Sequence, residues 1–157
     1  MNWARLYYEY VDRSLRVPAF AETDRESMAD GEWKQRVGRA GEDLAAKFLR
    51  REGLKVLYRN FRAPKGGEVD IVCRDGEMLA FVEVKTRTSS DYGNPGRAVD
   101  RKKQTLITKG AIAWLRALNF PDVIFRFDVI EVILEPGQPP KIAHQRNVFE
   151  LPANYRY

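Results

Sequence analysis

Two apolar segments of this chain carry charged residues where a buried strand would place only apolar side chains. Residues 69–72 read Val-Asp-Ile-Val, residues 81–84 read Phe-Val-Glu-Val, and Lys85 follows directly. Ionised groups are costly to bury unless a partner compensates them. Local rules broken in this way are typical of functional sites, so Asp70, Glu83 and Lys85 are the first candidates.

The dipeptide Asp75-Gly76 between these segments predicts a β-hairpin with a two-residue loop. Side chains alternate along a strand, so one face of this hairpin carries four charged groups: Glu68, Asp70, Glu83 and Lys85. Asp70 and Glu83 become diagonal neighbours at roughly 6 Å. Two carboxylates at that distance repel by roughly 3 kcal/mol at an effective dielectric of about 20, and a divalent cation would replace repulsion by coordination. The alternative is a solvated hairpin face with a few ion pairs.

An acidic residue followed by Glu-x-Lys at the end of an apolar strand is a known nuclease arrangement. The hairpin resembles the catalytic core of the PD-(D/E)xK, or restriction-endonuclease-like, superfamily. From about Arg36 to Leu134 the chain looks like the bacterial YraN-like family of that superfamily, and its layout is similar to archaeal Holliday-junction resolvases. The matching segments are residues 38–42 (Gly-Arg-Ala-Gly-Glu), 60–62 (Asn-Phe-Arg), 67–70 (Gly-Glu-Val-Asp), 81–87 (Phe-Val-Glu-Val-Lys-Thr-Arg) and 126–128 (Arg-Phe-Asp).

Hydrophobic periodicity and turn residues predict an α/β fold, a central mixed β-sheet flanked by helices in the order α-β-β-β-α-β. The resemblance implies that this is a restriction-endonuclease-like core. We expect residues 1–35 to be an N-terminal helical extension and linker, 36–150 the endonuclease-like domain and 151–157 a tail. The expected elements are an amphipathic helix over 1–17, a linker or a marginal turn of helix over 19–36, helices over 37–52 and 99–118, strands over 54–60 and 123–134, the two hairpin strands on either side of Asp75-Gly76, and an edge strand over 142–149. Leu118 is expected to face inward from the second long helix.

Composition narrows the function classes. A net charge of +5 and a pI of about 9.4 favour polyanionic partners. The single cysteine, Cys73, excludes an internal disulfide and a cysteine zinc site, and its alternation with neighbouring apolar residues indicates a buried strand position. No membrane-length apolar stretch or signal-peptide pattern is present, so we expect a cytoplasmic protein without a membrane partner. The single histidine, His144, is expected at the surface of the tail region.

The resemblance implies roles for particular residues. Glu42 borders the apolar face of its predicted helix, and the matching glutamate in the resembled families is an active-site acid. Asp70 and Glu83 would bind one or two Mg²⁺ or Mn²⁺ ions, with the Val84 carbonyl as a third ligand and Glu42 acting through water. Lys85 would orient the attacking water or stabilise the phosphate. The predicted catalytic set is therefore Glu42, Asp70, Glu83 and Lys85.

Basic side chains near this site are expected to contact nucleic-acid phosphates. They are Arg62, Arg87, Arg97, Lys102 and Lys103. For Lys103 and its neighbour Gln104, a solvated helix face is the stronger alternative.

Three functions follow as hypotheses. The first is a metal-dependent endonuclease acting on structured or branched DNA, and the second is a nucleic-acid-binding module whose nuclease site is idle. The third is an interaction protein that uses the N-terminal stripe of Trp3, Leu6, Tyr7, Tyr10 and Val11. Symmetric cutting of two strands would favour a homodimer, whereas the same stripe folded back onto its own domain would leave a monomer.

Overall fold

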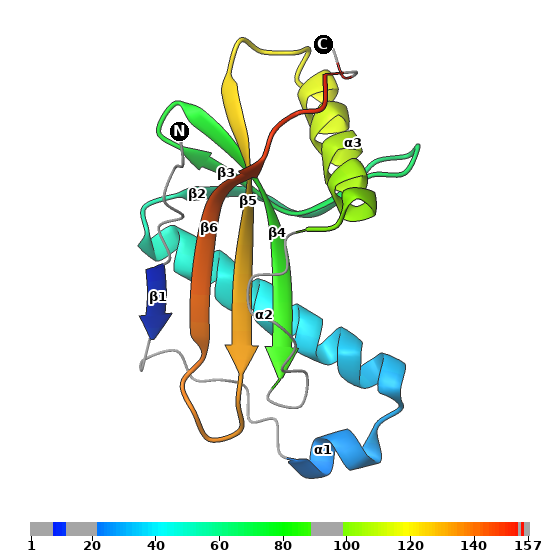
Figure 1. The fold of residues 1–157 in the computed structure, drawn as a ribbon, viewed down its shortest axis with the longest axis vertical. Helices are drawn as coiled ribbons and strands as arrows, with labels where there is room; N and C mark the ends of the chain where they lie inside the picture. The colour runs from blue at the N-terminus through cyan, green and yellow to red at the C-terminus, as the bar shows by residue number, and fades with distance from the viewer. Residues whose placement is uncertain (1–7, 12–21, 89–98, 154, 156–157) are drawn as a thin grey trace.

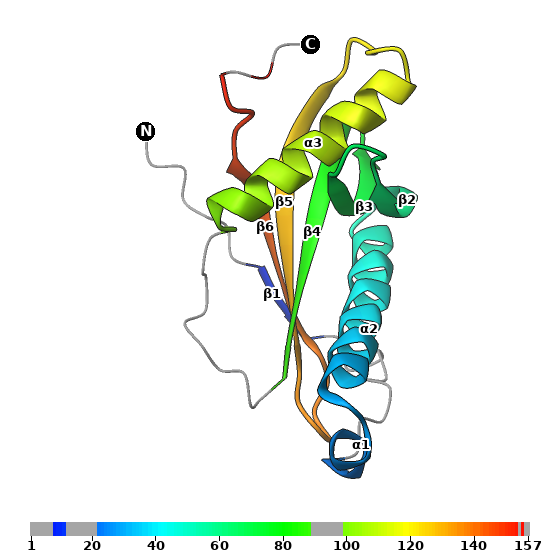
Figure 2. The same ribbon diagram turned by 90° about the vertical axis from the view of Figure 1, so that its right-hand side faces the viewer.

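The computed structural model describes residues 8–11, 22–88, 99–153 and 155, and these form a mixed sheet between two long helices (Figure 1). Six strands lie in the order β1-β6-β5-β4-β3-β2. The view turned by 90° shows α2 on one side of the sheet and α3 on the other (Figure 2). In chain order the elements are β1 (Tyr8–Val11), α1 (Glu22–Ser27), α2 (Asp30–Arg51), β2 (Lys55–Arg62), β3 (Glu68–Asp75), β4 (Met78–Thr88), α3 (Arg101–Ala117), β5 (Ile124–Leu134) and β6 (Lys141–Phe149).

The fold class predicted from the sequence is confirmed. β4 and β5 pair in parallel, whereas the other described strand pairs are antiparallel, so the sheet is mixed. A parallel pair needs a crossover connection, and α3 lies in that connection and covers one face. The elements α2-β2-β3-β4-α3-β5 reproduce the predicted order α-β-β-β-α-β.

Both faces of the sheet are buried, which explains the nearly continuous apolar runs of its central strands. In β4, Ala80 and Val82 pack in the core beneath α2, while Leu79 and Phe81 pack in the core beneath α3. The expected stripe of α2 is confirmed as fully buried: Leu44, Ala45, Phe48 and Leu49. Cys73 is buried as predicted, and burial raises the pKa of its thiol to about 12, which excludes a nucleophilic role at neutral pH.

The hairpin loop lies one residue later than the sequence predicted. Asp75 pairs with Met78, so Gly76 and Glu77 form the loop. Gly76 has a φ of +58° and Glu77 has no positive φ, a pattern typical of a type II′ turn with glycine in first place. Compared with the predicted pairing, the β4 partner of each β3 residue shifts by two positions. Because side chains alternate with a period of two, each residue still lies on the predicted face of the sheet.

The helix predicted over residues 1–17 was wrong where the structure describes that segment. Tyr8–Val11 forms a strand, β1, antiparallel to β6, so β1 and not β6 is the edge strand. In four residues the alternation Tyr-Glu-Tyr-Val fits a strand as well as a helix, and Tyr and Val favour strands. The expected stripe residues Trp3, Leu6 and Tyr7 lie outside the described residues.

In the segment predicted as a linker or a marginal turn of helix, the described residues are largely helical, in α1 and the first turns of α2. α2 begins at Asp30, earlier than predicted, and Trp33 packs against the α2-side core, which extends the apolar stripe by one turn. Leu118, expected to face inward, follows the end of α3 and is half-exposed. In the described residues no helix is long and apolar enough to cross a membrane.

His144 is buried rather than exposed, which corrects the expectation from its place in the sequence. Its Nε2 atom lies 2.9 Å from Asp128 Oδ2, and Arg126 Nε donates to both oxygens of Asp128 at 2.9 and 3.0 Å. Arg126 also donates to Asp75 at 2.8 Å, which ties the hairpin tip to β5. Although burial opposes it, hydrogen bonding and charge from His144 and Arg126 lower the pKa of Asp128.

Candidate active site

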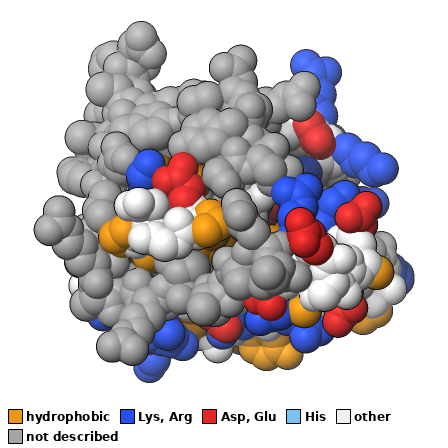
Figure 3. Space-filling view, turned by 90° about the horizontal axis from the view of Figure 1, so that it is seen from below, with side chains coloured by type: hydrophobic (Ala, Val, Ile, Leu, Met, Phe, Trp, Pro, Cys, Tyr) orange, Lys and Arg blue, Asp and Glu red, His pale blue; other side chains and the backbone are white. Residues whose placement is uncertain are grey.

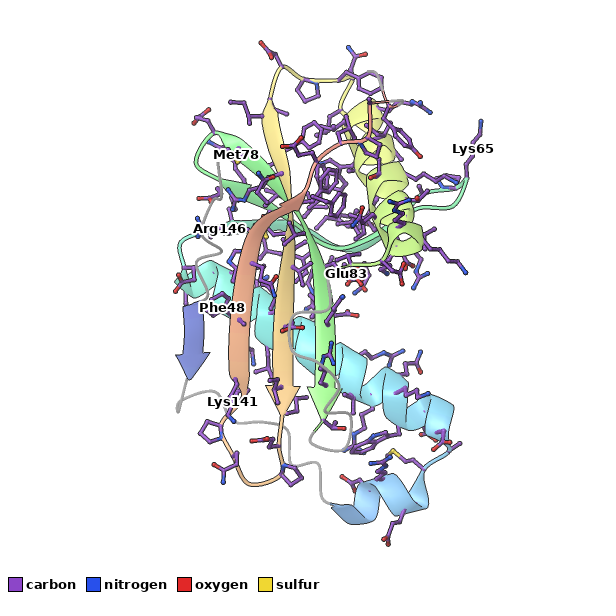
Figure 4. All side chains as sticks on the ribbon, in the orientation of Figure 1. Phe48, Lys65, Met78, Glu83, Lys141 and Arg146 are labelled. Carbon is purple, nitrogen blue, oxygen red and sulfur yellow. The ribbon has the colours of Figure 1, made fainter. Side chains whose placement is uncertain are left out.

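Acidic side chains from neighbouring strands meet where β3 and β4 stop pairing. The last described backbone pair of this hairpin is Ile71 with Val82, and the next position in the same register places Asp70 opposite Glu83. The two carboxylates are therefore direct neighbours, rather than the diagonal neighbours predicted from the sequence. Glu83 lies on β4 beside the start of α3 (Figure 4).

Glu83 is the most perturbed acid of the site. It is only 7% exposed, and its Oε2 atom accepts no hydrogen bond. Lys103 Nζ lies 3.3 Å from that oxygen, an ion pair without hydrogen-bond geometry. Burial, followed by the charge of Asp70, raises the pKa of Glu83 to about 8 against the opposing effect of Lys103. The metal-free site therefore holds a proton at neutral pH.

The Asp70 carboxylate is held by a hydrogen bond from the backbone of β4. Its Oδ2 atom accepts a hydrogen bond from the Val84 N–H at 2.8 Å. This bond fixes the carboxylate beside the strand that carries Glu83 and Lys85. The sequence prediction that Asp70 and Glu83 share one face is confirmed.

Lys103 supplies positive charge to the acidic cluster from α3. Its Nζ atom donates to Glu68 Oε1 at 2.5 Å and contacts Glu83. The Asp100 side chain caps α3 by accepting from the Lys103 backbone N–H at 2.8 Å, which fixes the first turn of the helix. Burial alone would lower the pKa of Lys103, but the hydrogen bond to Glu68 and the charges of Glu83 and Asp70 raise it.

Two glycines allow α3 to approach β3 closely enough for this contact. A Cβ atom on Gly67, whose φ is +145°, would lie 2.6 Å from the Gly110 nitrogen. A Cβ atom on Gly110 would lie 2.9 Å from Val69 Cγ2 and 3.0 Å from the Glu68 backbone. Larger residues at either position would separate the helix from the strand that carries Glu68.

Glu42 reaches the same region from α2. Its neighbour Gly41 packs directly against Thr86, because a Cβ atom there would overlap the threonine hydroxyl. Burial, and to a smaller extent the charge of Asp70, raise the pKa of Glu42, while a hydrogen bond with Asn60 opposes the rise. The half-buried Glu42 is therefore within electrostatic reach of Asp70.

Lys85 follows Glu83 on the same face of β4, and its register partner on β5 is Glu131. Glu131 is buried, and Arg87 Nη2 lies 3.7 Å from its carboxylate. Glu131 was not predicted as a site residue, although a charged residue within the apolar run of β5 is the same signal that identified Glu83. Glu68, which pairs with Lys103, was also given no role.

The predicted phosphate-contacting residues lie in different surroundings. Arg62 pairs with Glu68 at 3.2 Å, and Lys102 is exposed on the first turn of α3. Lys103 lies inside the acidic cluster, and Gln104 donates to the Val99 carbonyl at 2.8 Å, so neither belongs to a solvated face. Arg97 lies outside the described residues.

The carboxylate oxygens of this site are of the chemical type that binds a hard divalent cation. Carboxylate oxygens are the ligands that Mg²⁺ and Mn²⁺ prefer, and the buried Oε2 of Glu83 is an acceptor whose hydrogen-bonding capacity is unused. Across the described ranges, no three His, Cys, Asp or Glu side chains are already arranged as a metal site. Cation binding at these carboxylates would therefore require Glu83 to lose its proton and the acidic side chains to draw closer.

Comparison with known proteins identifies relatives of the whole core. A family model described as "Uncharacterised protein family UPF0102" matches residues 41–132, which include both carboxylate strands and Lys103. The UPF0102 protein of Trichlorobacter lovleyi is 48% identical over 122 residues, covering 77% of this chain and 95% of the relative. UPF0102 proteins of Geobacter metallireducens and Nocardia farcinica are 50% and 43% identical, covering 73% and 74% of this chain and 93% and 91% of the relatives. The chain therefore belongs to the UPF0102, or YraN-like, family of the restriction-endonuclease-like superfamily.

Proposed function

We propose that this protein is a metal-dependent endonuclease that hydrolyses phosphodiester bonds in structured or branched DNA. The observation that carries this proposal is the pair formed by Glu83, buried with an unbonded oxygen, and Asp70 opposite it. A buried acid as strongly perturbed as Glu83, held beside a second carboxylate, is unfavourable for folding and typical of functional sites. The restriction-endonuclease-like fold adds support by analogy, since a fold alone does not determine an activity.

Asp70 and Glu83 would hold one or two Mg²⁺ or Mn²⁺ ions, with the Val84 carbonyl and a water held by Glu42 as further ligands. The ion would neutralise phosphate charge and lower the pKa of the attacking water. Asp70 is already oriented by the Val84 N–H, so one ligand of the pair is preorganised. Glu83 must release its proton before it can coordinate, and this couples metal binding to pH.

The reaction requires water to give up a proton and attack phosphorus, while the bond from phosphorus to the leaving oxygen breaks and that oxygen takes up a proton. Lys85 follows Glu83 on the same face, and its ammonium group suits a hydrogen bond to a phosphate oxygen or to the attacking water. Lys103 is already within the cluster and would provide a second positive charge as its acidic partners turn toward a cation. Both lysines are thus assigned to phosphate and water positioning.

One observation favours a second candidate, a nucleic-acid-binding module with an idle site. Lys103 pairs with both Glu68 and Glu83, so an internal ammonium group already supplies part of the charge that a metal ion would bring. If that arrangement persists in the presence of divalent ions, the protein would bind DNA without cutting it.

The test is cleavage of four-way, flap, single-stranded and linear DNAs with Mg²⁺ or Mn²⁺. Glu83→Gln removes the central carboxylate at nearly constant volume, and Glu77→Gln, at a side chain that is 99% exposed, is the matched control. The nuclease proposal expects cleavage by the wild type and by Glu77→Gln but none by Glu83→Gln. DNA binding without cleavage would support the idle module, and cleavage unaffected by Glu83→Gln would refute the assigned site.

A further inference from the structure

A groove lies beside the acidic cluster, between α3 and the loop that joins β2 to β3. Its volume is about 480 Å³, within the range of about 300–1,000 Å³ that is typical of ligand sites. The walls are largely apolar, with Pro64 from the loop, Ile112 from α3 and Tyr155 from the C-terminal segment. Three exposed cations also line the groove: Lys65, Lys109 and Arg116.

The charges along the groove are of one sign. None of the described residues that line it is acidic, and within the described ranges no carboxylate pairs with Lys65 or Lys109. Lys65 projects from its loop beside α3 (Figure 4). By contrast, the end of the molecule seen from below shows Lys and Arg side chains interleaved with Asp and Glu (Figure 3). The groove is therefore a locally positive surface suited to an anionic ligand.

The loop that lines the groove leads along the chain into the proposed active site. The loop of residues 63–67 leads directly into Glu68, and Gly67 packs against α3 at Gly110. On α3, Lys109 follows Lys103 by six residues, which corresponds to roughly 9 Å along the helix axis. A ligand in the groove would thus begin less than two helical turns from the acidic cluster.

This combination of an apolar wall and cations fits an unpaired nucleotide better than a duplex. In a duplex the base faces are stacked inside and only phosphates and groove edges reach a protein surface, whereas an unpaired strand offers base faces for apolar and aromatic contacts. Tyr155 and Ile112 provide such a surface, and the cations can bind the flanking phosphates. An acidic peptide is the competing occupant, but it lacks the repeated alternation of flat ring and phosphate.

We infer that this groove binds a single-stranded segment of the DNA whose backbone enters the acidic site. The inference rests on the proposed function and specifies its substrate class: DNA with an unpaired strand next to the scissile bond, such as a flap or an opened branch. The contacts are phosphates to Lys109 and Arg116 and a base face to Tyr155.

The test measures binding of the full chain to single-stranded and duplex oligonucleotides by fluorescence anisotropy in EDTA, across a range of salt concentrations. The double variant with Lys109→Ala and Arg116→Ala should reduce the salt slope for single strands by about 0.7 for each lost phosphate contact. Tyr155→Ala should weaken single-strand binding at least about fivefold and change duplex binding little. Lys47→Ala, at an exposed lysine on α2 across the sheet, is the control and should bind like the wild type.

Circular dichroism and thermal unfolding would verify that each variant is folded. Ultraviolet crosslinking of wild-type protein to a bromodeoxyuridine strand gives a readout without substitution, and the crosslink should map to residues 109–117 or to Tyr155. Single-strand binding equal to that of Lys47→Ala in both groove variants, with the crosslink elsewhere, would overturn the inference, as would preferential capture of an acidic peptide.

The binding test and the cleavage test can refute the groove inference and the endonuclease proposal independently. If cleavage depends on Glu83 but the groove variants bind normally, only the groove inference is refuted. If the groove variants lose single-strand binding but no protein cleaves DNA, the groove is supported as a binding site and the endonuclease proposal is refuted.

Discussion

Replacing Glu83 by Gln should stabilise the metal-free protein at neutral and alkaline pH. Burial and the charge of Asp70 raise the pKa of Glu83 from 4.5 to about 8. Between these values the native protein holds a proton that the unfolded chain has released, so the free energy of unfolding falls as pH rises. The glutamine side chain of the variant does not titrate, so the stability of the variant should not fall with pH through this effect between the two pKa values.

The size of the effect follows from the shift. One pKa unit corresponds to about 1.4 kcal/mol, so the full shift would correspond to about 5 kcal/mol, an upper value because relaxation of Lys103 and entry of water reduce it. We therefore expect the wild type to lose about 2–3 kcal/mol of unfolding free energy relative to Glu83→Gln between pH 5 and pH 7. The lowered pKa values of Glu68 and Asp128 place their titrations below this window.

Urea denaturation in EDTA at pH 5, 6, 7 and 8 would measure this difference. Glu42, whose pKa is also raised, contributes equally to wild type and variant and cancels in the comparison. Glu77→Gln, at an exposed side chain, should follow the wild type. Parallel stability profiles of the wild type and Glu83→Gln would refute the assignment of a buried, protonated acid at this position.

Three further substitutions test the supports of the site. Lys103→Met should cost about 1–3 kcal/mol in EDTA, because the Glu68 carboxylate loses its hydrogen-bonded counter-charge, and Mn²⁺ should raise its melting temperature more than that of the wild type; equal shifts would contradict this. Gly110→Ala should lower the free energy of unfolding by about 1–3 kcal/mol through overpacking against β3. Gly38→Ala, with no atom within 4 Å of its added Cβ, should instead stabilise the protein by up to about 1 kcal/mol. Equal effects of the two substitutions in chemical denaturation would show that the close approach of α3 to β3 is unimportant. Asp128→Ala should cost about 3–5 kcal/mol because Arg126 loses its buried partner, and a thermal shift no larger than that of a surface variant would contradict it.

The face shared by the acids could be predicted from the sequence because it depends only on the alternation of strand side chains. The predicted loop was displaced by one residue, yet Asp70 and Glu83 still met, since the change in register was two. The order of helices and strands was likewise predictable, because apolar periodicity and turn residues are local signals.

The features that were missed depend on contacts between distant parts of the chain. β1 exists through pairing with β6, and His144 is buried through its hydrogen bond to Asp128, so neither can be deduced from neighbouring residues. Lys103 was predicted as a phosphate contact because nothing local shows that two glycines bring α3 against β3. The Asp70–Glu83 pair was therefore predictable from the sequence, whereas Lys103 as its counter-charge inside the protein was not.

The most direct test of the account is calorimetric titration of Mn²⁺ into the wild type and Asp70→Asn at pH 7, in two buffers with different ionisation enthalpies. The account predicts that the wild type binds Mn²⁺ with release of a proton, because the pKa of Glu83 is about 8 in the metal-free protein. It predicts that Asp70→Asn loses this binding while remaining folded. Equal binding by both proteins, binding without proton release, or no binding by the wild type would contradict a metal site at the Asp70–Glu83 pair.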